Sequence, residues 1–131
     1  MSKSAILCVD DEIAILESLE IELTKAFDDT YLYETAESAD EALEIIEELQ
    51  NDSIAIIVIV SDWLMPGIKG DEFLIQVHKK YPNSIKILLT GQADESAIER
   101  VKTQANLHRC LRKPWKSQDL IETIKFALAQ L

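Results

Sequence analysis

The sequence predicts an α/β domain in which one parallel sheet is covered by helices on both faces. Short runs with strand character alternate five times with segments whose apolar residues recur at helical spacing. This alternation is typical of parallel sheets with crossover helices. The segment Ile54–Asp62 is apolar on both strand faces except for its small Ser and its last residue, as a central parallel strand must be. With 131 residues and no repeat or linker, residues 1–131 are expected to form a single domain.

Five segments are expected to be strands. Ala5–Asp10 is a short apolar run that ends in charge, and Tyr31–Thr35 alternates and is rich in aromatic residues. The other three are Ile54–Asp62, Ser84–Thr90 and Leu107–Arg112. The last of these is the most polar, which suits the edge of a sheet.

Five helices are expected, and their spacing identifies the residues that face inward. These are Ile13, Leu16, Leu19, Leu23 and Phe27; Ala42, Ile45, Ile46 and Leu49; Phe73, Leu74, Val77 and Tyr81; Ala97, Ile98, Val101 and Ala105; and Leu120, Ile124, Ala127, Leu128 and Leu131. Ser38 and Glu41 match a capping box, and Ser117 is expected to cap the last helix. Pro82 is expected to stop the third.

Composition argues against several classes of protein. The net charge of −11 disfavours direct nucleic-acid binding. The chain has no apolar run long enough for a membrane span and no signal peptide, so a cytoplasmic location is expected. The two cysteines, Cys8 and Cys110, do not look like a disulfide framework or a zinc site.

The charge is distributed unevenly along the chain. Residues 1–62 hold 17 acidic and 2 basic side chains, whereas residues 63–131 hold 7 acidic and 11 basic ones. Either the surface simply has an uneven composition, or two faces of the molecule meet different partners.

Polar side chains follow four of the expected strands. Asp10 and Asp11 end the first strand, Asp62 the third, Thr90 the fourth, and Lys113 follows the fifth. Because the carboxyl ends of parallel strands share one rim of a sheet, these groups are expected to converge.

Such a convergence suits phosphoryl transfer. Two carboxylates about 4 Å apart repel by roughly 4 kcal/mol at an effective dielectric near 20. Three ionised carboxylates are therefore tolerable if a divalent cation lies among them. Oxygen ligands with open positions suit Mg²⁺. A Lys ammonium and a Thr hydroxyl can hold phosphoryl oxygens, and an Asp can act as a nucleophile that forms an aspartyl-phosphate.

The same residues resemble the receiver domain of two-component response regulators. The resemblance rests on Asp10-Asp11, on the string Ser61-Asp62-Trp63-Leu64-Met65-Pro66-Gly67-Ile68-Lys69-Gly70, on Leu89-Thr90-Gly91 and on Lys113-Pro114. It extends from about Ala5 to the end of the chain. It implies the flavodoxin-like strand order 2-1-3-4-5.

The resemblance also implies roles for single residues. Asp62 would accept a phosphoryl group from a sensor histidine kinase or a phosphotransfer protein. Mg²⁺ would be held by Asp11, Asp62 and the backbone carbonyl of Leu64, with Asp10 acting through water. Lys113 would pair with the phosphoryl group, Thr90 would move toward it, and the Lys113–Pro114 bond would be cis. The domain would be a phosphorelay switch that catalyses only its own phosphorylation and dephosphorylation, not an enzyme.

The sequence departs from the family pattern at two positions. Cys110 stands three residues before Lys113, where the family usually has Tyr or Phe, and Gly91 stands where a small residue such as Ala is common. We therefore expect output to depend more on the fourth helix and its loop. Leu64 and Gln92 flank the site, and an apolar Leu64 cannot orient an attacking water, so slow self-hydrolysis is expected.

Other readings stay open from the sequence. The chain could be an interaction module with this fold that works without phosphate, and Cys110 favours that reading. A phosphatase with an aspartyl intermediate is disfavoured, because its usual D-x-D-x-T string is absent from the first strand. The expected output face comprises the fourth helix, the fifth strand and the fifth helix. This face would bind a downstream effector or a fused output domain. A homodimer is also compatible with the sequence.

Overall fold

The computed structural model describes residues 3–91 and 95–131, and these form alternating strands and helices. The strands are β1 (Ala5–Val9), β2 (Leu32–Ala36), β3 (Ile56–Asp62), β4 (Ile85–Thr90) and β5 (Arg109–Arg112). The helices are α1 (Ile13–Phe27), α2 (Ala39–Asn51), α3 (Gly70–Lys80), α4 (Glu95–Gln104) and α5 (Ser117–Ala129).

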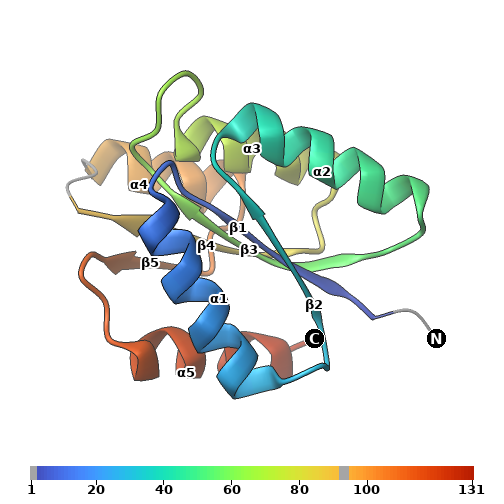
Figure 1. The fold of residues 1–131 in the computed structure, drawn as a ribbon. Helices are drawn as coiled ribbons and strands as arrows, with labels where there is room; N and C mark the ends of the chain where they lie inside the picture. The colour runs from blue at the N-terminus through green and yellow to red at the C-terminus, as the bar shows by residue number, and fades with distance from the viewer. Residues whose placement is uncertain (1–2, 92–94) are drawn as a thin grey trace.

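All strand pairs are parallel, and the order is β2-β1-β3-β4-β5. The expected flavodoxin-like order is therefore confirmed. Helices α2, α3 and α4 lie on one face of the sheet, and α1 and α5 lie on the other (Figure 1). The apolar Ile54–Asp62 segment supplies the central strand, and the polar β5 is an edge strand, as expected.

Two apolar cores follow from the alternation of side chains along each strand. On β3, Ile59 faces the core under α2, α3 and α4, whereas Val58 and Val60 face the core under α1 and α5. Phe73 of α3 is fully buried in the first core, and Leu19 of α1 is fully buried in the second. These two cores hold the helices against both faces of the sheet. The carboxyl ends of the strands are left at one rim of the sheet, between the two helix layers.

Four expectations about the helices and strands are corrected. Ser117 does not cap α5, because the N-cap position is Lys116 and no side chain caps that end. Ile13 and Leu131 do not face inward: they are 56% and 71% exposed, since Ile13 is the first residue of α1 and Leu131 lies beyond the end of α5. The strands are also trimmed or shifted by one or two residues, as in β2, which begins at Leu32.

The start of α2 agrees with the capping expectation. The Ser38 hydroxyl accepts a hydrogen bond from the Glu41 backbone N–H at 3.1 Å. The Glu41 carboxylate reaches back one residue further than in the usual capping box, to the backbone N–H of Glu37 at 3.2 Å. Among the described residues, no helix combines the length and apolar character needed to cross a membrane.

Candidate functional site

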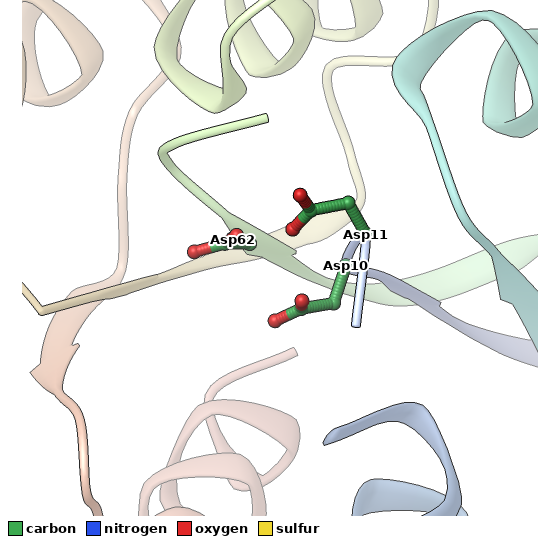
Figure 2. Close-up of side chains that lie close together, drawn as sticks. All are labelled: Asp10, Asp11 and Asp62. Carbon is green, nitrogen blue, oxygen red and sulfur yellow. The ribbon is translucent and has the colours of Figure 1, made fainter. Parts of the chain in front are cut away.

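Three carboxylates meet at the carboxyl ends of the two central strands. Asp10 and Asp11 follow β1, and Asp62 is the last residue of β3, which is the immediate neighbour of β1. One oxygen from each carboxylate lies within 4.8 Å of the others. Figure 2 shows the three side chains turned toward a common point. The convergence expected from the strand ends is therefore present.

The Lys113 ammonium, from the loop that follows the edge strand β5, completes the cluster. Its Nζ donates to Asp10 Oδ2 at 2.8 Å and lies 3.1 Å from Asp62 Oδ1. The backbone N–H of Lys113 donates to the carbonyl of Thr90 at 2.8 Å, which fixes the start of the β5–α5 loop against the end of β4. The following peptide bond, Lys113–Pro114, is cis, as the resemblance implied.

Burial dominates the electrostatics of Asp62. It raises the pKa of Asp62 to about 6; the hydrogen bond from Lys113 acts in the opposite direction, and the nearby Asp10 and Asp11 raise the pKa further. Burial also acts to lower the pKa of Lys113, but its hydrogen bonds to Asp10 and Asp62 outweigh burial and raise that pKa. One ammonium therefore offsets only part of the cost of placing Asp62 among two other acids.

The loop after β3 is held very close to the Asp62 backbone. A Cβ at Gly70 would collide with the carbonyl oxygen of Asp62, so only glycine fits at the first residue of α3. The backbone N–H of Gly70 also donates to the carbonyl of Trp63 at 2.8 Å. This explains physically why the string that follows Asp62 ends in glycine.

The cluster opens into a cleft of about 550 Å³. Its lining comprises Asp11, Glu12, Asp62, Leu64, Met65, Pro66, Gly91 and Lys113. Leu64 is 46% exposed there, whereas Asp10 and Thr90 are buried behind it. Gln92 lies outside the described residues.

Sequence reasoning assigned no site role to Glu12, Met65 or Pro66, although all three line the cleft. Glu12 was recognisable only as the third acid after the first strand. Met65 is almost fully buried and packs into the core, so its contribution depends on tertiary contacts.

The donor set fits a hard divalent cation. Three carboxylate oxygens lie together, Asp11 is exposed on the open side, and the cleft leaves room for water ligands. Asp10 is already engaged by Lys113 and by the Glu12 backbone N–H at 2.9 Å. Asp62 also pairs with Lys113, so the exposed Asp11 is the carboxylate most available to an ion.

Both cysteines have free thiols, as expected. Cys110 is partly buried, packs against the core under α3 and α4, and has a pKa raised by burial. Cys110 therefore places no aromatic ring three residues before Lys113, where the family usually has Tyr or Phe.

Comparison with known proteins agrees with this geometry. Residues 6–125 match the response regulator receiver domain family. The chain is 29% identical over 126 residues to the hydrogenase transcriptional regulatory protein HoxA of Cupriavidus necator, a match that covers 96% of this chain but only 24% of the relative. The chain thus spans about a quarter of the length of that relative.

Solved structures of the same kind superpose closely. The signal receiver domain of an HD domain-containing protein from Pseudomonas fluorescens has a TM-score of 0.86 and 29% identity, with 98% of this chain and 97% of that chain covered. A CheY-like receiver domain protein from Methanospirillum hungatei has a TM-score of 0.85 and 31% identity, with 98% and 96% covered. The chain belongs to the response regulator receiver domain family of two-component signalling proteins.

Proposed function

We propose that residues 1–131 form one receiver domain that acts as a Mg²⁺-dependent phosphorylation switch, with Asp62 as the phosphoacceptor. The observation that carries this proposal is the meeting of Asp10, Asp11 and Asp62 with the Lys113 ammonium in one open cleft. The donor would be the phosphohistidine of a sensor histidine kinase or a phosphotransfer protein.

In the proposed reaction, a carboxylate oxygen of Asp62 attacks the phosphorus of the phosphohistidine. An O–P bond forms, the N–P bond breaks, and the imidazole leaves with the electron pair. Lys113 lies where its ammonium can pair with a phosphoryl oxygen, and Thr90 ends the neighbouring strand. Bound Mg²⁺, held by Asp11, Asp62 and the Leu64 carbonyl with Asp10 in support, would neutralise charge on the transferring group.

We further propose that the signal leaves through the face formed by α4, β5 and α5. The ring of Phe126 is 64% exposed on α5, and its centroid lies 6.4 Å from that of His108. This aromatic pair, set among exposed basic residues, suits contact with a downstream effector or a fused output domain. Among the relatives, HoxA is a transcriptional regulatory protein, which is consistent with a fused output domain in a longer chain.

The direct test is incubation with Mg²⁺ and a small phosphodonor, followed by intact mass spectrometry. Wild type should gain one base-labile phosphoryl group, and Asp62→Asn should gain none. Asp52→Asn, at the exposed end of α2, is the matched control and should behave as wild type. If wild type gains no phosphoryl group from any donor, the proposal fails in favour of an interaction module that works without phosphate, the alternative that Cys110 favours.

A further inference from the structure

Arg100 of α4 reaches the first turn of α3 across a cleft between the two helices. Its guanidinium donates to Asp71 Oδ2 at 2.9 Å and to Glu72 Oε2 at 3.3 Å, both in the first turn of α3. The cleft, of about 460 Å³, is lined on one side by the loop after β3, including Trp63 and Lys69, and on the other by the first turns of α4. The ion pair therefore bridges a solvated gap.

The two carboxylates differ in what they lose if Arg100 is removed. The Asp71 side chain is only 9% exposed, and its ion pair with Arg100 is the one found for it within residues 3–91 and 95–131. The Glu72 side chain is 48% exposed and can be hydrated. A buried carboxylate that loses its partner is destabilised more than an exposed one, so Asp71 is the dominant contact.

Asp71 is linked to the backbone of Asp62 through the residue that precedes it. The preceding residue, Gly70, touches the Asp62 carbonyl so closely that no Cβ fits, and its N–H donates to the Trp63 carbonyl. A shift of the first turn of α3 would therefore move the loop that carries Leu64 and Met65, two residues that line the acidic cleft.

Helix α4 contributes few fully buried side chains to its contact with the rest of the domain. Within the helix only Ala97 and Val101 are buried, whereas six residues of α3 are buried.

We propose that Arg100 is a positioning residue that couples the placement of α4 to the geometry of the acidic cleft, through Asp71 and Gly70. The inference rests on the proposed function, since it assigns Arg100 a part in regulating that site. The coupling is reciprocal: if one placement of α4 strengthens ion binding in the acidic cleft, then a bound ion favours that placement of α4. Loss of the ion pair should weaken Mg²⁺ binding, although the ion pairs found for Arg100 among the described residues are with Asp71 and Glu72, which do not line the acidic cleft.

The test compares Arg100→Gln with Lys102→Gln, an exposed α4 cation for which the described residues offer no ion pair and whose removal changes the net charge equally. Mg²⁺ affinity is measured by titration calorimetry. Arg100→Gln should weaken binding by about two- to five-fold, and Lys102→Gln should leave it near the wild-type value. Backbone hydrogen exchange without metal should increase in α4 and in residues 63–69 for Arg100→Gln alone.

A double-mutant cycle with Asp71→Asn separates positioning from a general loss of charge. If the two residues act as one unit, Arg100→Gln/Asp71→Asn should be no worse than the more affected single variant. Arg100→Lys keeps the charge but cannot span two carboxylates, and should be intermediate. Circular dichroism of each variant checks folding, and the exposed Arg100→Lys serves if Arg100→Gln fails to fold.

The outcomes distinguish this inference from the proposed function. Equal Mg²⁺ affinity and exchange in wild type and Arg100→Gln would overturn the role of Arg100 and leave phosphorylation at Asp62 intact. Absence of phosphorylation in wild type would overturn the proposed function, while the Mg²⁺ comparison would still decide the role of Arg100. If wild type binds no Mg²⁺, both the coupling to the cleft and the proposed ion site are wrong.

Discussion

The buried surroundings of Asp62 disfavour the charged form of its carboxylate. Its carboxylate is almost fully buried, stands beside Asp10 and Asp11, and receives one ion pair from Lys113. Its pKa of about 6 lies above the value of about 3.9 in an unfolded chain. The folded state therefore holds this proton more tightly between about pH 4 and pH 6, and stability falls as the pH rises through that window.

Replacement of this acid should therefore stabilise the protein. Asp62→Asn is expected to raise the free energy of unfolding by about 1–3 kcal/mol at neutral pH without metal, because the buried charge is gone. The gain should shrink toward zero as the pH falls below about 4, where Asp62 becomes protonated in both states. Urea unfolding with a chelator present measures both values, with Asp52→Asn as the exposed control. A difference that does not change with pH would contradict the assigned cause.

Leu64 should set the lifetime of the phosphorylated state. It is 46% exposed on the cleft and has no group that can orient a water molecule. Leu64→Asn is therefore expected to accelerate loss of the phosphoryl group, followed by intact mass over time after removal of the donor. Ile13→Asn, at another exposed apolar position, the first residue of α1, is the control. Loss no faster than in wild type would refute the assignment.

At the level of single elements, β4 contains a buried cation that the fold does not need for its core. Lys86 is 1% exposed and donates to the carbonyl of Ser84 at 2.7 Å, and burial lowers its pKa to about 8. Between Ile85 and Ile87, which face α1 and α5, it points to the side of α3. There His78 has a pKa lowered by burial and by Lys86, and its Nδ1 is buried with no hydrogen-bond partner among the described residues.

Lys86→Met should accordingly stabilise the protein by about 1–3 kcal/mol at neutral pH. Below about pH 8 the wild type carries the full penalty of the buried charge, and above it the penalty is relieved as the folded state loses the proton first. The gain should thus shrink as the pH rises from about 8 to about 10.5. NMR titration should also show a higher His78 pKa in the variant. Lys80→Met, on the exposed part of α3, is the control, and a comparable effect there would argue against burial as the cause.

The helix starts provide a second test at this scale. Ser38 caps α2 through the Glu41 N–H, whereas Ser117 is the first residue of α5 and caps nothing. Ser38→Ala should lower the free energy of unfolding by about 1 kcal/mol, and Ser117→Ala should change it much less. Thermal or urea unfolding of the pair decides this, and equal losses would show that the hydroxyl of Ser38 is not the relevant difference.

At the scale of the whole molecule, position 110 carries no aromatic side chain. Cys110 is small and partly buried, so in the proposed switch it would offer no ring whose rotation could signal the state of Asp62. We expect the signal to run instead from the loop after Asp62 through α3 to α4. The sheet and its two cores, which contain β1, β3 and β4, are packed on both faces and are expected to change little.

Binding of a beryllofluoride phosphoryl mimic should therefore change backbone chemical shifts and hydrogen exchange along α4 and the segment that follows Thr90. The Asp62→Asn variant, which cannot take up the mimic, is the control. A response restricted to residue 110 would contradict this prediction.

Much of the fold was predictable because its signals are local. The double-sided apolar run before Asp62 identified the central strand, and the polar stretch around Arg109–Arg112 identified an edge. The acids after the first and third strands and the Lys after the fifth predicted one cluster, because parallel strands end on one rim. Predictions for element ends were weaker: Ser117 has the chemistry of a cap, but the chain enters α5 one residue earlier.

Local pattern was enough to predict the layered α/β architecture and the charged residues that meet at the acidic cleft, since strand alternation and strand ends depend on neighbours along the chain. Three-dimensional packing was needed to find that Lys113 lies within 3.1 Å of Asp62, that Lys86 is buried against α3, that Glu12, Met65 and Pro66 also line the cleft, and that Arg100 bridges α4 to Asp71. These contacts join residues from different elements, and their strengths depend on burial and distance. Neither quantity is encoded in the local pattern around an exposed or charged residue.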